Sequence, residues 1–479
     1  MRLSSAARLS DTGFLAKEIT DWKKDPKRKM QISGEDYYNG RHAILKAVRK
    51  VIGRDGKMQE APYLPNCRIV DNQYANAVDK KVNYLLGKPL TFDTQNRAYA
   101  EALGTVLNSA FFRTLRNVGE DSLNGGIGWI MPHYDEEGNF CLHRFEPYEI
   151  LPFWRDAAHT KLDAAVRLYE AEEYEGMTRK ITEHVEVFTP EGIVYYRRSG
   201  EALVPEEPFY TPYVFADGEA QAWSRIPLVA FKYNAKEQPL ICRVKSLQDG
   251  INTITSNFEN NLLEDPHNTI LVIVNAEGTD LGEFRHNLAR YGAVKVRNDA
   301  AHPGGDVKTL NVEVNAENYK AILKIFKDAF TENARSYDAK DDRMGNNPNE
   351  MNLLSMYSDI DLDANGMEAE YQAAFEELLW FVNMHLLHTG QGDFENEPVK
   401  VIFNRDVMMN TSERITQVKN SVGILSQRTL LSNHPFVKDV DAELKLLKKE
   451  QEEERQTMED YGGTFGQHCH AGTDEQDGA

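Results

Sequence analysis

Residues 241–266 read ICRVKSLQDGINTITSNFENNLLEDP. Apolar side chains recur every three or four residues along this stretch, at Val244, Leu247, Ile251, Ile254, Phe258 and Leu262. This spacing predicts an amphipathic helix with one apolar face, and Pro266 marks its end. About 24 residues at about 1.5 Å per residue give a rod of roughly 36 Å.

A second helix of the same kind is predicted over residues 315–334, NAENYKAILKIFKDAFTENA, with Asn315 as its N-cap. Between the two helices lies an insertion of roughly 45 residues with two predicted strands, NTILVIVNA at 268–276 and AVKVR at 293–297. Two helices with narrow apolar stripes can bury one stripe between them. The remaining apolar surface predicts packing against other copies of the chain.

The first half of the chain has a mixed pattern. DYYNGRHAILKAVRK, at 36–50, predicts a short amphipathic helix with Ile44, Leu45 and Val48 on one side. Two hairpins are predicted further on, one turning at Asp135–Asn139 and one at Pro190–Gly192. Up to about residue 235 the sequence therefore indicates an α+β region.

Residues 78–92, VDKKVNYLLGKPLTF, contain a Gly-Lys pair of the kind found in phosphate-binding loops. A P-loop requires GxxxxGK followed by Ser or Thr, between a strand and a helix. Here position 82 is Val, Pro89 follows the lysine, and the order is helix then strand. We interpret Gly87 as the end of a helix, and this excludes a nucleotide site.

The second half of the chain is largely helical. Residues 336–352 are rich in Asn, Asp, Gly and Pro and predict a loop. A long helix is predicted over 365–390, followed by a strand in PVKVIFN at 398–404 and by helices from Asn410 onward. The predicted buried face of the 365–390 helix carries Met367, Tyr371, Phe375, Leu378, Val382 and Leu386.

The amino-acid composition of the chain limits which classes of function are possible. The 479 residues carry 75 Asp and Glu against 55 Lys and Arg, a formal charge of −20. Such acidity argues against tight binding of nucleic acid through phosphate neutralisation. The four cysteines are far apart, which predicts a reducing compartment, and neither a secretory signal nor an apolar run of ~18 residues is visible.

Four stretches of the sequence resemble the portal proteins of tailed bacteriophages, of the siphophage and prophage type from Gram-positive hosts. The resemblance extends in one order from about residue 36 to 455. The stretches are YYNGRHAIL (37–45), CRIVDNQYANAVDKKVNYLLGKPLTF (67–92), LNGGIGWIMPHYDEEGNFCLHRFEPYEILPFW (123–154) and GILSQRTLLSNHPFVKDVDAELKLLKKEQ (423–451).

The resemblance implies an α+β, mainly helical subunit that joins a ring of about twelve copies around a central tunnel. After an N-terminal segment, 1–35, it implies a wing (36–240, completed by 353–410) and two stem helices (241–265 and 313–335). It also implies a small α/β clip (266–312), a tunnel loop (336–352), a helical crown (411–456) and a disordered tail (457–479).

The function implied is a conduit for double-stranded DNA at one capsid vertex, used in genome packaging and ejection. The implied partners are the terminase motor, head-completion and adaptor proteins, and the major capsid and scaffolding proteins. The location implied is the virion, with the host cytoplasm during assembly and no membrane. Two alternatives are a packaging ATPase or nuclease subunit and a minor DNA-associated protein of the capsid interior.

Candidate DNA-facing residues follow from this resemblance. The loop offers mixed charges and amides that contact phosphates weakly, at Lys340, Asp341, Asp342, Arg343, Met344, Asn346 and Asn347. On the second stem helix, Lys320, Lys324 and Lys327 lie away from the apolar stripe and are candidates for lining the tunnel.

No catalytic constellation is predicted. The sequence has no GxSxG, HExxH or CxxC pattern. Asp441, Glu443 and Lys445 superficially match a nuclease triplet, but they occupy a predicted charged helix rather than a strand. We therefore expect no enzyme activity, no cofactor and no metal, and we interpret His468-Cys469-His470 as part of the tail rather than a metal site.

Overall fold

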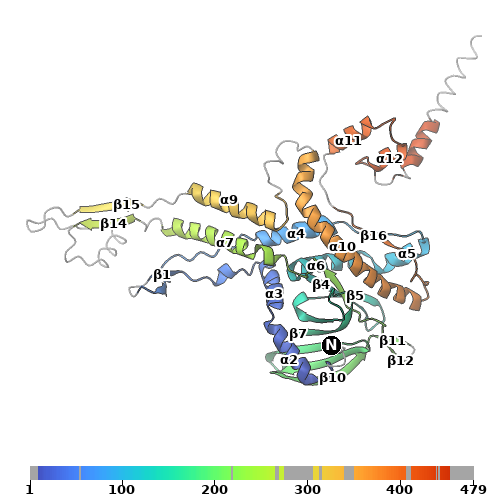
Figure 1. The fold of residues 1–479 in the computed structure, drawn as a ribbon, viewed down its shortest axis with the longest axis horizontal. Helices are drawn as coiled ribbons and strands as arrows, with labels where there is room; N and C mark the ends of the chain where they lie inside the picture. The colour runs from blue at the N-terminus through green and yellow to red at the C-terminus, as the bar shows by residue number, and fades with distance from the viewer. Residues whose placement is uncertain are drawn as a thin grey trace, which may run out of the picture. The chain divides into compact units, whose positions relative to one another are not determined.

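The computed structural model describes residues 9–52, 56–216, 219–264, 269–274, 306–311, 316–338, 350–405, 411–437, 440 and 443–453. The chain divides into two compact units. One contains residues 1–337 and 359–406, and the other contains residues 338–358 and 407–479. Helices and antiparallel sheets alternate along the chain, which confirms the mixed α+β class (Figure 1).

Two capped helices precede the first sheet. Helix α2 (Thr12–Lys24) begins at Asp11, whose carboxylate accepts hydrogen bonds from the N–H groups of Gly13 and Phe14. Helix α3 (Pro26–Tyr38) begins at Asp25 and places Pro26 in its first turn, where no N–H partner is needed. The buried side of α2 shares a core with the sheet that follows.

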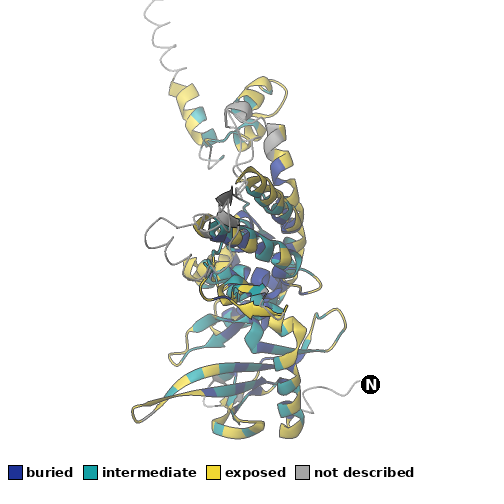
Figure 2. Ribbon diagram, turned by 90° about the vertical axis from the view of Figure 1, so that its left-hand side faces the viewer, coloured by how far each residue is buried: buried dark blue, intermediate teal, exposed yellow. Residues whose placement is uncertain are grey.

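The largest sheet has five antiparallel strands in the order β10-β9-β8-β7-β6. The strands are β6 (Ile150–Trp154), β7 (Leu162–Glu175), β8 (Thr178–Phe188), β9 (Gly192–Ser199) and β10 (Ala202–Pro212). The predicted turn at 190–192 is confirmed, because Phe188 of β8 lies opposite Ile193 of β9. The far end of the β7–β8 hairpin is exposed (Figure 2), and Met177 there has no neighbours that cover it. The core shared with α2 includes Leu15, Ile19, Trp22, Ala164, Val166, Val185, Val187 and Tyr196.

A second sheet joins β13 (Val229–Lys232), β4 (Ile127–Tyr134) and β5 (Phe140–Phe145). The predicted hairpin is confirmed, with the Asp135 carboxylate accepting from the N–H groups of Glu137 and Asn139. Helix α6 (Ser109–Gly125) leads into β4 through Gly126, which has a φ of +80°. A Cβ at Gly126 would lie 2.2 Å from the carbonyl oxygen of Glu237, so this turn requires glycine.

The segment with the Gly-Lys pair forms a helix followed by a strand, as predicted. Helix α4 (Gln73–Leu86) ends at Gly87, whose N–H donates to the carbonyl of Asn83 at 3.0 Å. Strand β3 (Thr91–Asp93) then pairs with β16 (Lys400–Ile402), and Phe92 lies opposite Val401. Helix α5 (Arg97–Val106) follows. This order is the reverse of that in a P-loop.

The prediction of one amphipathic helix over residues 36–50 is wrong. Helix α3 ends at Tyr38, a short 3-10 turn covers Ala43–Lys46, and β1 (Lys50–Ile52) pairs with β2 (Met58–Glu60). Leu45 and Val48 are 41% and 47% exposed, so their helical spacing does not mark a buried face.

The two predicted central helices are present. Helix α7 covers Ile241–Glu264 and α9 covers Ala316–Asn333, within two residues of the predicted bounds. Strand β14 (Thr269–Val274) confirms the first predicted strand of the insertion, and it pairs with β15 (Asp306–Asn311), which we did not predict. The strand predicted at 293–297 lies outside the described residues.

Helix α10 runs from Glu350 to His388. We predicted a loop up to residue 352 and a helix from 365, so the prediction placed the start of this helix about fifteen residues too late. Residues 353–364, which neither prediction covered, lie within α10, and Ile360 and Ala364 are buried there. All six predicted core positions of the later part, from Met367 to Leu386, are at most 2% exposed.

Besides the first residues of α10, 350–358, the second unit is described over three helical pieces. Helix α11 (Thr411–Asn420) and α12 (Gln427–Ser432) are followed by a helix at 443–453. Ser426 caps α12 by accepting from the N–H of Thr429 at 3.3 Å. Asn410, the predicted cap of the first of these helices, lies outside the described residues.

Candidate functional site

The central feature of the larger unit is the pair α7 and α9, which lie side by side (Figure 1). The rings of Phe258 and Tyr319 are 4.9 Å apart, and the Asn261 amide donates to the Tyr319 hydroxyl at 2.7 Å. Gly250 permits the close approach, because a Cβ there would lie 2.5 Å from a ring carbon of Phe326. The chain thus leaves α7 into β14, returns through β15 and comes back along α9.

One buried face of α7 is polar. Four side chains at four-residue intervals, Gln248, Asn252, Ser256 and Asn260, are at most 3% exposed. They face residues 67–74, an extended segment that runs into the first turn of α4, which we name the clasp segment. We name the four side chains the polar ladder.

Each member of the polar ladder accepts a backbone N–H of the clasp segment. Asn260 accepts from Cys67 at 2.7 Å, and Ser256 accepts from Ile69 at 3.0 Å. Asn252 accepts from the N–H of residue 71 at 3.0 Å, and Gln248 accepts from that of residue 74 at 2.9 Å. The alternate N–H groups of residues 67, 69 and 71 are therefore satisfied by a helix rather than by a strand, and Gln248 satisfies an N–H in the first turn of α4.

The match between the two elements has a simple geometric cause. Four residues of helix rise about 6 Å, and two residues of extended chain span about 6.6 Å. Side chains at every fourth helix position can therefore meet every second residue of an extended segment, provided that they carry acceptors. The polar spacing 248, 252, 256, 260 is the sequence signal for this arrangement, and the search for apolar periodicity missed it.

Apolar residues on the helix pair stay exposed as a result. Leu262 and Leu263 on α7 are 49% and 52% exposed, and Ile322 and Ile325 on α9 are 46% and 63% exposed. We name these four residues the outer apolar patch. Leu262 was predicted as part of the buried stripe of α7, and that assignment is wrong. The stripe is buried nearer the start of the helix, where Val244 and Ile251 are 0% exposed.

The three candidate lysines of α9 differ in their surroundings. Lys320 and Lys324 are exposed. Lys327 forms an ion pair with Asp71 of the clasp segment at 2.7 Å. Tunnel lining by these lysines stays a prediction, and the intrachain ion pair gives Lys327 a second role in holding α9 against the clasp segment.

The predicted tunnel-loop residues, from Lys340 to Asn347, lie outside the described residues, as do residues 468–470. The chain just before the loop is firmly held. Lys81 of α4 donates to the carbonyl of Arg335 at 3.0 Å, and Lys80 donates to that of Tyr337 at 2.7 Å. These contacts fix the backbone that follows α9.

Lys81 also forms a buried ion pair with Asp363 of α10, at 2.6 Å, in which both side chains are at most 7% exposed. The hydroxyl of Tyr233 donates to the same carboxylate at 2.6 Å, and the guanidinium of Arg243 lies 3.5 Å from it. Burial alone would raise the pKa of Asp363, but Lys81 and its other donors outweigh burial and hold that pKa below its usual value. We name this group the Lys81 node.

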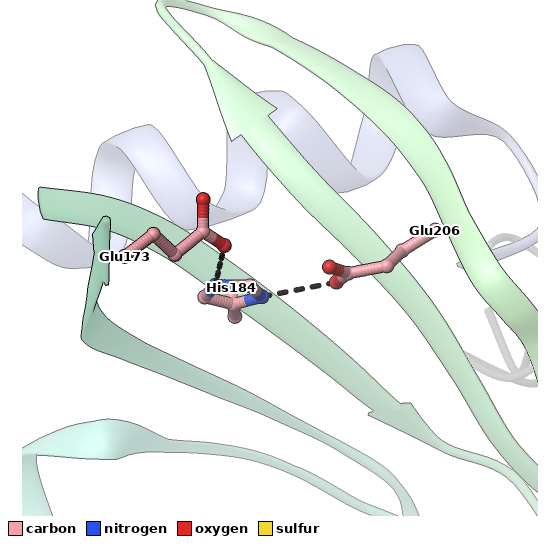
Figure 3. Close-up of side chains that lie close together, drawn as sticks. All are labelled: Glu173, His184 and Glu206. Carbon is pink, nitrogen blue, oxygen red and sulfur yellow. Dashed lines mark hydrogen bonds and ion pairs between the residues drawn. The ribbon is translucent and has the colours of Figure 1, made fainter. Parts of the chain in front are cut away.

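A second polar group lies on the five-stranded sheet (Figure 3). The two ring nitrogens of His184 on β8 face different carboxylates, with Glu206 3.0 Å from Nδ1 and Glu173 3.2 Å from Nε2. Glu173, His184 and Glu206 each bring one possible ligand atom within 4.8 Å of the others, a spacing that suits a metal ion as well as direct ion pairs.

The sequence is similar to known proteins along most of its length. The family model described as "Phage portal protein, SPP1 Gp6-like" matches residues 19–457. The chain belongs to this family. The prediction made from residues 36–455 is thereby confirmed, and the family model extends the similarity into α2 at its N-terminal end.

Two portal proteins are similar along nearly their whole length. The portal protein of Bacillus phage SPP1 is 26% identical over 464 residues, which cover 95% of this chain and 90% of that protein. The portal protein of Clostridium phage phiCD119 is 27% identical over 455 residues, which cover 92% and 97% respectively. Both phages infect Gram-positive hosts, as expected from the sequence.

Phage portal proteins are structural components of the virion capsid, and this portal protein is assigned to that class. Within the part of the chain that the structure describes, none of the helices combines the length and apolar character needed to cross a membrane. The family assignment does not favour a packaging ATPase or nuclease subunit.

Proposed function

We propose that this portal protein assembles into a closed ring of about twelve copies, which encloses a tunnel for double-stranded DNA at one capsid vertex. DNA enters through the ring during packaging and leaves through it at ejection. The ring itself catalyses nothing and binds no cofactor. The subunit assembles in the host cytoplasm before it becomes part of the virion.

The outer apolar patch is the observation that carries this proposal. Within its own chain, α7 is held by the polar ladder, so the patch is not needed to hold the subunit together. Exposed aliphatic side chains on two neighbouring helices favour association with identical surfaces. In a heterologous ring, the patch of one copy packs against the next copy, and the contact repeats until the ring closes.

Different parts of the subunit bind different partners. Residues 266–312, with the β14–β15 hairpin, form the clip on which terminase and later the head-completion adaptors dock. Residues 36–240 and 353–410 form the wing, which meets major capsid and scaffolding proteins, and residues 411–456 form the crown. The family match across all of these segments supports the assignment.

DNA passage depends on weak contact with phosphates. The net charge of −20 repels DNA and limits tight binding. Lys320 and Lys324, exposed on α9, provide sparse positive belts around the tunnel, and residues 336–352 provide the loop that touches the duplex. Such a lining lets a polyanion slide in both directions.

Electron microscopy of the purified full-length protein tests the proposal directly. Rings of one size with a central hole are expected at moderate salt, and ATP turnover is expected to stay at background with or without DNA. A protein that remains monomeric at every salt concentration would refute the ring. ATP turnover stimulated by DNA would instead favour the packaging ATPase.

A further inference from the structure

A small cavity in the larger unit has a strongly acidic lining. Its volume is about 210 Å³, and it is formed by α3, α6, β5 and the turn that follows β5. Neither the polar ladder nor the Lys81 node contributes to it. Among its lining residues are Glu35, Glu120, Asp121, Arg144, Glu146 and Tyr148.

The charges of this cavity do not balance. Four carboxylates line it, and Arg144 is the one cation among the lining residues. The guanidinium of Arg144 is shared, because it lies 3.3 Å from Asp121 and also binds Glu146. Glu35 has a more distant cation, Arg41, at 3.9 Å. Asp121 is buried, whereas the side chains of Glu35 and Glu146 are 28% and 27% exposed, so the excess negative charge is only partly solvated. A further cation would compensate it.

Asp121 is the strongest sign of a missing donor. Its side chain is 9% exposed, and its Oδ2 atom accepts no hydrogen bond although Arg144 lies nearby. Burial raises the pKa of Asp121 well above its usual value, and the neighbouring carboxylates raise it further. Burial likewise raises the pKa values of Glu35 and Glu120. A carboxylate in this position gains most from a ligand that donates to it.

The spacing of the carboxylates indicates which kind of cation fits the cavity. A bare metal ion needs three or more ligand atoms around one point. In the described part of the chain, the acidic groups whose ligand atoms converge in this way are those around His184, and not those of this cavity. Separated acceptors fit a cation that spreads several N–H donors over a few ångströms. The volume holds about seven waters at ~30 Å³ each, which matches a short amine.

We propose that this cavity binds an alkylammonium or guanidinium group through Glu35, Asp121 and Glu146. The group comes from one of two sources. It is either a free diamine or guanidine of the cell, or a Lys or Arg side chain of a second copy of the chain. The chemistry of recognition is the same for both sources.

Titration calorimetry with the full-length protein tests this proposal. Putrescine and agmatine are the probes, and tetramethylammonium, which has no N–H donor, and Mg²⁺ are the controls. We expect one saturable site per chain for at least one of the two probes and none for either control. Each titration is run on the wild type and on Ile325→Asp, a variant designed to prevent ring contacts.

Comparing the wild type with Ile325→Asp distinguishes a free amine from a side chain of a second copy. Binding to both proteins supports a free amine as the occupant, and binding to Ile325→Asp alone supports a side chain of a neighbouring copy. Failure of both probes on both proteins overturns the proposal, and so does equal binding of Mg²⁺ or tetramethylammonium. The result on Ile325→Asp does not depend on whether the wild type forms rings.

Asp121→Asn is the decisive variant, because it removes the charge and keeps the shape. We expect probe affinity to fall about tenfold or more, since a charge-assisted hydrogen bond is lost. Glu136→Gln, at an exposed turn position, removes the same charge and should bind as the wild type does. If Asp121→Asn does not fold, Glu35→Gln takes its place. Unchanged affinity in the folded variant overturns the site.

Discussion

Asn252 of helix α7 accepts the backbone N–H of Asp71 at 3.0 Å, and its own amide donates to Nδ1 of His42 at 2.7 Å. The side chain is fully buried. It therefore joins three segments that are far apart in the sequence. A leucine would fill a similar volume but would remove the hydrogen bonds to the N–H of Asp71 and to Nδ1 of His42.

We predict that Asn252→Leu destabilises the larger unit by about 2–4 kcal/mol, because each buried group left without a partner costs about 1–3 kcal/mol. Urea unfolding followed by fluorescence measures the loss. Asn257→Leu on the exposed side of the same helix is the matched control and should change stability by less than about 0.5 kcal/mol. Equal stability of the two variants would show that the polar ladder does not hold α7.

Lys81→Met is predicted to cost about 3–5 kcal/mol, because it leaves the Asp363 carboxylate buried without its nearest cation. The double variant Lys81→Met, Asp363→Asn should recover part of this loss, since no charge is then stranded. Arg97→Met breaks an exposed ion pair with Glu101 and should cost well under 1 kcal/mol. Thermal unfolding of the three variants measures their loss of stability. A double variant less stable than Lys81→Met alone would contradict this account.

Glu377 on α10 gives a prediction for pH. Burial raises its pKa from 4.5 to about 7, although Arg225 and Lys232 oppose the shift. Below pH 4.5 both the folded and the unfolded chains hold the proton. Between pH 4.5 and about 7 the unfolded chain loses this proton while the folded chain keeps it, so stability falls across that range and then levels off.

Glu377→Gln should therefore be more stable than the wild type at pH 8, by at most about 3 kcal/mol, and should have no such advantage at pH 4.5. The difference in unfolding free energy between the two proteins isolates Glu377, because all other groups titrate in both. A constant difference between pH 4.5 and pH 8 would contradict the raised pKa.

Ile325→Asp places a charge in the outer apolar patch, where the residue is 63% exposed in the single chain. We predict that the variant folds as the wild type does, but that rings are lost or strongly reduced in mass photometry. Met177→Asp at the exposed tip of the β7–β8 hairpin has the same chemistry and should leave ring formation intact. Loss of rings in both variants would point to a general effect of charge and not to the patch.

The helices and hairpins of this portal protein were predictable where apolar spacing and turn residues agree. The bounds of α7 and the turn at Asp135 follow from such local patterns. The start of α10 did not, because Asn and Asp residues before Gly366 are typical of loops, and a long helix tolerates them only through its packing. The 3-10 turn at Ala43 was misread for the opposite reason, since its apolar spacing suggested a face that is not buried.

The contacts of the candidate site depend on segments that the sequence does not relate to one another. The apolar stripe of α7 was correct as a periodicity and as a buried face at Val244 and Ile251, but its last member, Leu262, is exposed. The partner of that helix is the backbone of residues 67–74, and backbone groups leave no trace in hydropathy. The acidic cavity is likewise built from Glu35, Asp121 and Glu146, which come together only in the fold.

The polar ladder has a consequence for the order of events during assembly. Amides and a hydroxyl attach α7 to its own subunit, and the aliphatic side chains at its end and on α9 stay exposed. In the proposed ring, contacts between copies therefore do not use the residues that hold α7 within the subunit.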